Sequence, residues 1–531
     1  MEKIQGKTRK PSSVGVIDIG SGFLQLKIAI QEESKTVSVL ESVTKSLAIG
    51  RETFSEGRIS PEMMRELSQC LLGFRQLLRE YKVRRVRVVA TGAIREAVNR
   101  EYVLDQIRAV TGFNIEIMNG PEERFLTQQA IQKVLSGYEK MKKEGLLSVN
   151  IGSGGVQIVA YDTEGLRYSQ NVPMGALRIR RILSRLELQS ATYTKLLEEY
   201  IDYHVQEVVE PLKGKYKHLV MTGEEVESIC RISESIKESA QDQLKSLNLT
   251  QPKVHVLDFN EQSKLYERLI YMNPSQVSAE FGVSFERAEM LLPTIMIMKA
   301  FERASTAKKI YNPSVGLSDG ILLEMCREKN DQEAETELLQ YTRFFAKQYF
   351  YVEKHVEKVV EAALLLFDHL GKKQNLTKRH RLLLEMSAVL HDIGKAVNLE
   401  KHGECGSALI LSMDLMGVSE EEQNQLAVLV RYHEGGEPRT EDEQYRALSR
   451  KARLAVSKLL AVLQLANAMD CSHKQKLFDL SVRLEGNVFI LRAYAKENAM
   501  LEEWVFQQSS SLFHEVFGLK PQLNIRRSKM N

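Results

Sequence analysis

The same short pattern occurs twice in the first part of the chain. Residues 14–30 read VGVIDIGSGFLQLKIAI and residues 146–162 read LLSVNIGSGGVQIVAYD, so an Ile-Gly-Ser-Gly turn joins two apolar runs in both. Apolar runs on either side of a glycine turn predict a β-hairpin. Such a turn can aim backbone N–H groups at an anion, because glycine has no side chain in the way. We therefore expect two related subdomains that face each other across a phosphate-binding cleft.

The carboxylate before the first turn is replaced by an amide before the second. Asp18 precedes the first turn and Asn150 precedes the second. A carboxylate at the end of a strand can hold Mg²⁺ directly or through water, which makes Asp18 a candidate metal ligand. Hydrolysis of a phosphate also needs a base for the attacking water, and Glu122 and Glu123 in GPEER lie at a predicted helix start, a usual place for one.

An arginine completes the predicted cleft. Arg95 in ATGAIREA follows a predicted strand and can give two hydrogen bonds to one phosphate group. Taken singly, these features are weak indications, since most Gly-Ser-Gly turns are ordinary hairpin turns and glutamates at a helix start usually serve the helix dipole. The order in which these features occur along the chain indicates a phosphate-binding cleft more strongly than any one of them does.

The pattern of predicted elements changes near Cys326. Before it, strand-like and helix-like segments alternate, which favours an α/β fold. After it, apolar residues recur at helical spacing, as in HVEKVVEAALLLFDHL. The last part, with LFDLSVRLEGNVFILRAYAK, returns to strands. Because 531 residues are too many for one core, we expect two facing subdomains, a helical module and a small α/β tail.

The composition narrows the range of partners and locations. A net charge of +3 is too small to argue for nucleic acid or membrane binding, and the helix-turn-helix-like segment NPSQVSAEFGVSFERAEML has no basic excess. The five cysteines are scattered without a CxxC pair, which favours reduced thiols. No apolar run approaches the ~20 residues that span a bilayer. We therefore expect a cytoplasmic protein that binds neither membrane nor DNA.

A set of motifs occurs in the order found in one known family. IDIGSGFLQLKI, ATGAIREA, NGPEERFLTQQA, NIGSGGVQIV, VPMGALR, ERAEMLLP and GLSDGILLE together resemble the exopolyphosphatase and guanosine pentaphosphate phosphohydrolase family. The resemblance implies a duplicated actin-like, sugar-kinase-like ATPase core of the ribonuclease H-like type. Lobe I would then comprise residues 1–124 with a return segment at 300–327, and lobe II residues 125–299.

The same resemblance implies an activity and roles for residues of the cleft. The activity is Mg²⁺- or Mn²⁺-dependent removal of the terminal phosphate from polyphosphate or pppGpp, in a protein that forms a homodimer. Glu123 would be the base that activates water. Asp18 would be a ligand of the metal ion, and Asn150 would be a second, weakened ligand. The residues placed in contact with phosphate are Ser21, Gly22, Arg95, Gly152, Ser153, Gly154 and Gly155.

Two positions in the second hairpin depart from the family pattern. The family normally has Asp-Ile-Gly-Gly-Gly-Ser-Thr-Glu there, whereas this chain has Asn150 for the aspartate and Gln157 for the glutamate. Both changes keep size and hydrogen bonding but remove negative charge, so we expect a weaker Mg²⁺ site. In the third turn, VMTGEEVES, Glu224 and Glu225 would repel a polyanion unless they point away. Two interpretations stay open: slow hydrolysis, or a site that binds polyphosphate or guanosine penta- or tetraphosphate as a regulatory signal.

A second cluster of candidate ligands lies in the helical part. HDIGK at residues 391–395 ends an apolar predicted helix, and RYHE follows later. Imidazoles with carboxylates suit a divalent ion that activates water. Residues 340–475 resemble the HD-domain phosphohydrolase superfamily, so we expect an all-α HD-type domain at 335–475 and a small α/β domain at 476–531. The candidate ligands are His355, His391, Asp392, His402, His433 and Asp470.

The HD-type cluster also departs from its superfamily. The last ligand there is an aspartate in a run like Leu-Ala-Asp-Ala-Leu-Asp, and this chain has Asn467 at that place in LQLANAMD. Asp470 lies three residues on, on nearly the same helix face, and could substitute. The alternatives are a second divalent metal ion with phosphohydrolase chemistry in this domain, or a helical scaffold whose histidines line a cleft without chemistry.

Overall fold

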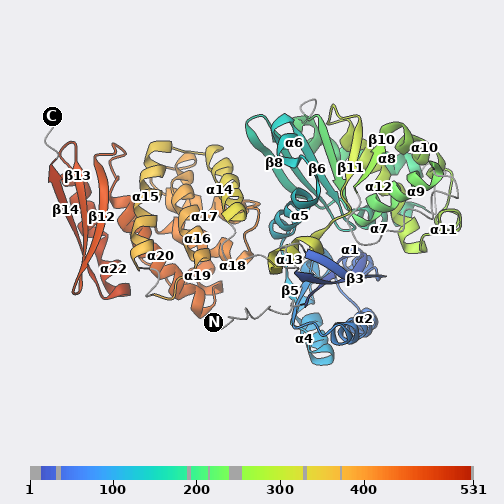
Figure 1. The fold of residues 1–531 in the computed structure, drawn as a ribbon, viewed down its shortest axis with the longest axis horizontal. Helices are drawn as coiled ribbons and strands as arrows, with labels where there is room; N and C mark the ends of the chain where they lie inside the picture. Colours follow the sequence, from blue (N-terminus) through green and yellow to red (C-terminus); the bar gives the residue numbers. More distant parts are fainter. Residues whose placement is uncertain are drawn as a thin grey trace, which may run out of the picture. The chain divides into compact units, whose positions relative to one another are not determined.

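The computed structural model describes residues 13–31, 37–187, 193–212, 216–237, 254–326, 332–370 and 374–527. The chain forms two compact units, Met1–Asn330 and Asp331–Asn531. The first unit contains two mixed β-sheets with their helices, and the second contains a helical bundle and a three-stranded sheet (Figure 1).

The first sheet is built around the first glycine hairpin. Its strands lie in the order β3-β2-β1-β4-β5, with β1 antiparallel to β2 and parallel to β4. Ile17, Leu24 and Leu26 of the hairpin share one buried cluster with Leu67 and Leu71. The elements are β1 Ser13–Ile19, β2 Phe23–Gln31, β3 Val37–Ser46, α1 Gly50–Glu56, α2 Pro61–Glu80, β4 Arg85–Ala90, α3 Gly92–Glu96, α4 Arg100–Thr111 and β5 Glu116–Ile117.

The second sheet repeats this arrangement around the second hairpin. Its strands lie in the order β10-β11-β9-β6-β7-β8, and β6 is antiparallel to β7 and parallel to β9, as β1 is to β2 and β4. The elements are α6 Tyr138–Glu144, β6 Leu146–Ile151, β7 Val156–Asp162, β8 Gly165–Val172, α7 Ala176–Glu187, α8 Tyr193–Val209, η1 Glu210–Leu212, β9 His218–Thr222, α9 Glu224–Lys237, β10 His255–Asp258, α10 Phe259–Leu269, α11 Pro274–Phe281, α12 Phe285–Glu302 and β11 Lys309–Asn312. The duplicated hairpin therefore occupies the same place in both sheets.

Two further helices, α5 Gly120–Val134 and α13 Leu317–Cys326, pack against each other in the first unit. Leu126 of α5 and Ile321 of α13 belong to one buried cluster with Val14 of β1. The predicted boundary between the lobes at residue 124 falls inside α5. The predicted return segment 300–327 is divided: β11 pairs with β9 and β10 in the second sheet, and α13 packs on the first sheet.

The second unit combines a helical bundle with a small sheet. Apolar faces of α15, α16 and α20 form its interior; Val359, Leu384 and Leu460 are fully buried there. Strand β13 lies between β12, which is antiparallel to it, and β14, which is parallel. The elements are α14 Gln332–Lys347, α15 Glu353–Leu370, α16 Lys378–Leu390, η4 Ile393–Ala396, α17 His402–Ser412, α18 Glu420–Arg431, α19 Glu443–Ala447, α20 Arg450–Ala468, β12 Leu477–Glu485, β13 Val488–Ala495, α21 Met500–Gln508, α22 Ser510–Phe517 and β14 Lys520–Arg527. Within the described ranges, no helix is long and apolar enough to cross a membrane.

Candidate functional site

The tips of the two glycine hairpins lie against each other. A Cβ added to Gly22 would lie 2.6 Å from Ser153 Oγ, and one added to Gly154 would lie 3.0 Å from Ser21 Oγ. Each turn is closed by one backbone hydrogen bond, of 3.0 Å in the first turn and 2.9 Å in the second. Side chains at these glycines would push the turns apart, so the repeated glycines allow the two loops to meet.

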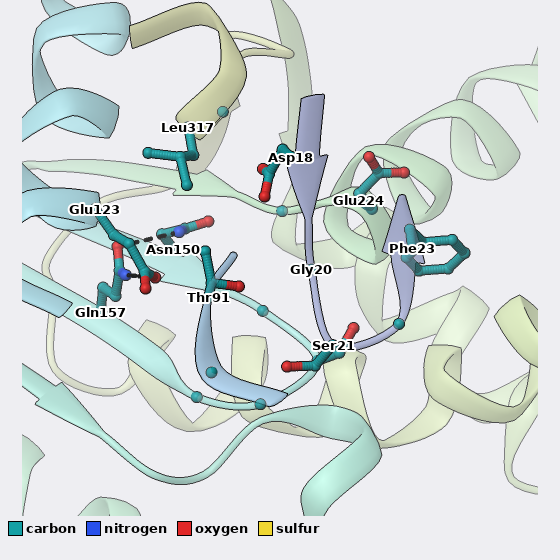
Figure 2. Close-up of a pocket in the computed structure, with 18 of the residues that line it drawn as sticks. Asp18, Gly20, Ser21, Phe23, Thr91, Glu123, Asn150, Gln157, Glu224 and Leu317 are labelled. Carbon is teal, nitrogen blue, oxygen red and sulfur yellow. Dashed lines mark hydrogen bonds between the residues drawn. The ribbon is translucent and has the colours of Figure 1, made fainter. Parts of the chain in front are cut away.

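A pocket lies where the two hairpins meet (Figure 2). It encloses about 1270 Å³, including the part open to solvent, which is enough for the end of a phosphate chain or for a nucleotide. Glu122, the other candidate base, is engaged in the capping box of α5 and does not line the pocket. The remaining predicted cleft residues all do: Asp18, Ser21, Gly22, Arg95, Glu123, Asn150, Gly152, Ser153, Gly154 and Gly155.

Glu123 stands in the first turn of α5. The helix start is fixed by a capping box in which the Asn119 side chain accepts from Glu122 N and the Glu122 side chain accepts from Asn119 N. Arg95 Nη1 lies 2.5 Å from Glu123 Oε1. Burial raises the pKa of Glu123 although Arg95 acts to lower it, and a raised carboxylate pKa favours a base near neutral pH.

A row of hydrogen bonds reaches Glu123 from the second sheet. Thr222 Oγ1 donates to Asn150 Oδ1 (3.1 Å), and Asn150 Nδ2 donates to Gln157 Oε1 (3.3 Å). Gln157 Nε2 donates to Glu123 Oε2 (3.0 Å). Figure 2 shows the bonds that join Asn150, Gln157 and Glu123. Both amides are therefore engaged with protein groups.

Asp18 faces the pocket from the end of β1 (Figure 2). Its Oδ1 is buried and has no hydrogen-bond partner among the residues that the structure describes. Burial, followed by the nearby charges of Glu123 and Glu224, raises the pKa of Asp18 to about 7. A buried carboxylate oxygen without a donor, beside further acids, suits a hard divalent cation such as Mg²⁺. The residues present therefore fit the expected metal ion at Asp18.

Glu224 and Glu225 both line the pocket. Glu224 Oε2 lies 2.8 Å from Arg287 Nη2, and its Oε1 accepts from Gln25 Nε2 at 3.3 Å. The Glu225 side chain is buried, and this burial raises its pKa to about 7. One acid is thus paired and the other is partly protonated at neutral pH, so they repel a polyanion less than their charges suggest.

The pocket also contains an arginine that was not among the expected phosphate-binding residues. Arg178 lies in the first turn of α7, and its Nε donates to the Gly154 carbonyl at 2.7 Å. Its guanidinium pairs with Glu96 of α3 and lies over the Phe54 ring. The motif VPMGALR could have indicated that Arg178 lies at the pocket. Arg178 follows Gly175 by three residues, and Gly175 packs against Ser153 in the turn of the second hairpin.

In the second unit, four histidines point their Nε2 atoms at one aspartate. The Nε2 atoms of His391, His402 and His433 lie 3.6, 3.8 and 3.7 Å from Asp392 Oδ1, and that of His355 lies 3.9 Å from Oδ2. The Nε2 atoms of His355 and His391 are 3.0 Å apart, and those of His402 and His433 are 3.3 Å apart. All five side chains are buried.

The other ring nitrogen of each histidine has an acceptor. The acceptors for Nδ1 are Ala388 O for His391 (2.7 Å), Leu399 O for His402 (2.9 Å), Val430 O for His433 (2.7 Å) and Asp470 Oδ2 for His355 (2.9 Å). These bonds place a proton on Nδ1 and leave the Nε2 lone pair free. Imidazole lone pairs that converge beside a carboxylate, each ring held by an outer acceptor, are typical of a metal site.

The charge states in this cluster also suit a metal ion. Burial lowers the pKa of His391 to about 3, so its imidazole is neutral at physiological pH. Burial acts to raise the pKa of Asp392, but neighbouring groups, among them the Lys395 ammonium 2.7 Å from its Oδ2, hold it well below its usual value. A neutral imidazole and an ionised carboxylate are the forms that bind a metal.

The structure departs from the expected ligand set at Asp470. α20 ends before Asp470, so the helical spacing that would make it a substitute ligand does not apply, and Asp470 contacts Nδ1 of His355 instead. His473, which was not among the expected ligands, approaches Asp392: its Nε2 is 3.8 Å from Asp392 Oδ2. Its ring stacks on His355 at 3.6 Å, from a left-handed backbone (φ 56°) that spacing could not predict.

Comparisons with known proteins cover both units. A sequence model of the Ppx/GppA phosphatase family matches residues 27–329, and a model of Ppx/GppA phosphatase domain III matches residues 342–504. A guanosine-5'-triphosphate,3'-diphosphate pyrophosphatase of Photobacterium profundum is 21% identical over 470 residues, covering 88% of this chain and 89% of that protein. The protein of the same name from Vibrio atlanticus is 19% identical over 462 residues, covering 86% and 88%.

Solved structures show the same fold. An exopolyphosphatase from Cytophaga hutchinsonii superposes with a TM-score of 0.52 at 18% identity, covering 59% of this chain and 98% of that chain. An exopolyphosphatase-like protein superposes with a TM-score of 0.51 at 18% identity, covering 60% and 98%. At 18% identity, these comparisons show a shared fold and nothing more.

Proposed function

Because this chain belongs to the Ppx/GppA phosphatase family, we propose that it releases the terminal phosphate of polyphosphate or pppGpp in the cleft between its two glycine hairpins. The observation that carries this proposal is the position of Glu123. Its side chain stands at a helix start, is only 13% exposed, and lines the pocket where the hairpin turns meet. A base held there can take the proton of a water molecule that attacks a phosphorus atom bound by the turns.

Each wall of the pocket contributes to the reaction. The turns at Ser21 and Gly154 offer backbone N–H groups to the terminal phosphate, and Arg95 can move from Glu123 to a phosphate oxygen, since both are acceptors for the same guanidinium. Asp18 would hold a divalent cation, which when bound supplies charge neutralisation of the phosphate oxygens. Once Arg95 leaves Glu123, the carboxylate is free to accept the proton of the attacking water.

Phosphate release tests this proposal directly. The full chain is incubated with long-chain polyphosphate or with pppGpp, each with Mg²⁺ or Mn²⁺, and free phosphate is measured over time. The proposal predicts metal-dependent release from at least one substrate, and the faster of the two identifies the preferred one. No release from either, with binding of both ligands intact, would contradict it.

The amides at Asn150 and Gln157 support one alternative function. Two acids of the family pattern are absent from the pocket, so a protein that binds polyphosphate or guanosine penta- or tetraphosphate without hydrolysis is the rival proposal. Calorimetric titration with the same ligands distinguishes them. Saturable binding with no phosphate released over hours favours regulation, and turnover favours the enzyme.

The histidine cluster supports a second activity of the HD type. We propose that His355, His391, Asp392, His402 and His433 bind a divalent metal ion, because their Nε2 lone pairs and the Asp392 carboxylate converge. A metal site there can activate water for phosphohydrolysis. Activity that disappears in His391→Ala and persists in Glu123→Gln would place the reaction in this cluster.

A cytoplasmic location and a homodimer complete the proposal. All five cysteines are free, three of them buried, which agrees with a reducing compartment. Sedimentation of the full chain measures the oligomeric state.

A further inference from the structure

We propose that Gln157 is a positioning residue for the catalytic base: its amide holds the Glu123 carboxylate, and Asn150 and Thr222 hold the amide. The inference rests on the proposed function, because it gives the two amides of the second hairpin a task in the same reaction. The base is then oriented by uncharged protein groups. With acids at these two positions, the carboxylates beside Glu123 would need a proton or a cation to hold them next to it.

The direction of every hydrogen bond in the row follows from its Glu123 end. A carboxylate can only accept, so the group of Gln157 that faces Glu123 must be its nitrogen. The Gln157 oxygen then faces Asn150, which must present its own nitrogen. The Asn150 oxygen is left to accept from the Thr222 hydroxyl. The chemistry of the row thus fixes both amide orientations, which are otherwise interchangeable in shape.

The sheet places these three side chains next to one another. Gln157 is the cross-strand partner of Asn150 on β7 and β6, and Thr222 is the partner of Asn150 on the other side, on β9. Directly opposite residues in adjacent strands present their side chains on the same face. The row therefore crosses three neighbouring strands, and its position is set by backbone pairing. Its far end meets α5, whose capping box fixes Glu123.

Acids at these positions would not reproduce the row. A glutamate at position 157 would bring its carboxylate about as close to Glu123 as the present amide, at a 3.0 Å contact. Two carboxylates at that separation cannot both ionise without a proton or a cation between them. Of the other charged or titratable groups near Glu123, Arg95 and Arg124 are positive, and Asp18, whose pKa is raised to about 7, is negative when ionised. Gln157 avoids a further negative charge at the point where the base must be ionised.

The inference also explains why the two departures from the family pattern occur together. Gln157 needs a donor for its oxygen, and an aspartate at position 150 would offer only acceptors. Asn150 supplies that donor and still accepts from Thr222. The pair of amides is therefore one unit, and changing either alone breaks the row.

The test compares four forms of the full chain: wild type, Gln157→Glu, Thr222→Val, and the swap Glu123→Gln with Gln157→Glu. The pH profile of kcat/KM is measured for the active forms with Mg²⁺. For Gln157→Glu we expect the acid limb to move up by about one pH unit and kcat to fall by about 10-fold. Thr222→Val, which only removes the far donor, should lower kcat less and leave the KM for substrate unchanged. An unchanged acid limb and kcat in Gln157→Glu would overturn the inference.

A second readout needs no activity and separates the inference from the proposed function. Thermal unfolding is followed in EDTA at pH 5 and pH 8. In Gln157→Glu the facing acids have raised pKa values in the folded state, so its Tm should fall relative to wild type as the pH rises. The swap restores one amide opposite one carboxylate, so its Tm at pH 8 should lie above that of Gln157→Glu, although the base and its ion pair with Arg95 are gone. A swap no more stable than Gln157→Glu at pH 8 would overturn the inference even if wild type hydrolyses phosphate, and a more stable swap would support it even if wild type does not.

Discussion

Arg178 Nη2 lies 2.7 Å from both carboxylate oxygens of Glu96, and this ion pair joins α7 beside the second sheet to α3 beside the first. The same guanidinium lies 4.1 Å from the centre of the Phe54 ring. Arg178 is largely buried, whereas the Glu96 side chain is 41% exposed. Both residues line the pocket, so a phosphate group bound there would compete with Glu96 for Arg178.

That competition predicts opposite effects for the two partners. Arg178→Ala should raise KM for the phosphate substrate by about 10-fold, because one guanidinium contact is lost. Glu96→Gln should lower KM, because the arginine no longer has to leave a carboxylate. Steady-state kinetics measure both. An equal rise of KM in the two variants would show that the pair serves the structure of the cleft and not its ligand.

Removal of metal ligands from the histidine cluster should remove bound metal. His391→Ala is expected to reduce the metal content of the purified protein by about one ion per chain, as measured by elemental analysis, because it deletes one converging Nε2 atom. His369→Ala is the matched control. His369 is exposed on α15 and its Nδ1 also faces a backbone carbonyl, that of Leu365. Equal metal content in wild type, His391→Ala and His369→Ala would contradict a metal site.

His473 should contribute to the same site in place of Asp470. His473→Ala is expected to weaken Mn²⁺ binding by about 10-fold in a calorimetric titration, since its Nε2 lies on the Asp392 side of the cluster. Asp470→Asn keeps an acceptor for the His355 ring and should weaken binding less. The reverse order of the two effects would restore Asp470 as the ligand.

The buried carboxylate of Asp18 predicts a pH dependence of stability without metal. Its folded pKa of about 7 lies above the unfolded value of 3.8, so the folded state holds the proton more tightly and stability falls as the pH rises from about 4 to 7. In EDTA at pH 8, Asp18→Asn should therefore raise Tm by a few degrees. Asp105→Asn, at an exposed site on α4, should not. A lower Tm for Asp18→Asn would contradict the assigned burial penalty.

The sequence predicted those parts of the site that depend on local chemistry. The two hairpins follow from their apolar runs and glycine turns, and Glu123 was expected at a helix start, where α5 begins. The strand-to-helix order and HDIGK likewise placed the phosphate cleft and the histidine cluster in separate parts of the chain.

The remaining features depend on contacts between distant segments. Gln157 meets Glu123, and Arg178 meets Glu96, only after the sheets have formed and packed. No periodicity in the sequence indicates that Arg178 lines the pocket. The position of Asp470 likewise depends on tertiary structure: α20 ends at Ala468, and the Asp470 carboxylate contacts Nδ1 of His355.

The most direct test of the central proposal is phosphate release by Glu123→Gln beside Glu122→Gln. The two glutamates are adjacent in the first turn of α5, and glutamine at position 122 can keep the capping box, so the second variant controls for the helix start. If Glu123 activates water, Glu123→Gln should lose activity by about 100-fold or more while Glu122→Gln stays near wild type. Activity of Glu123→Gln within a few-fold of wild type would contradict the cleft mechanism.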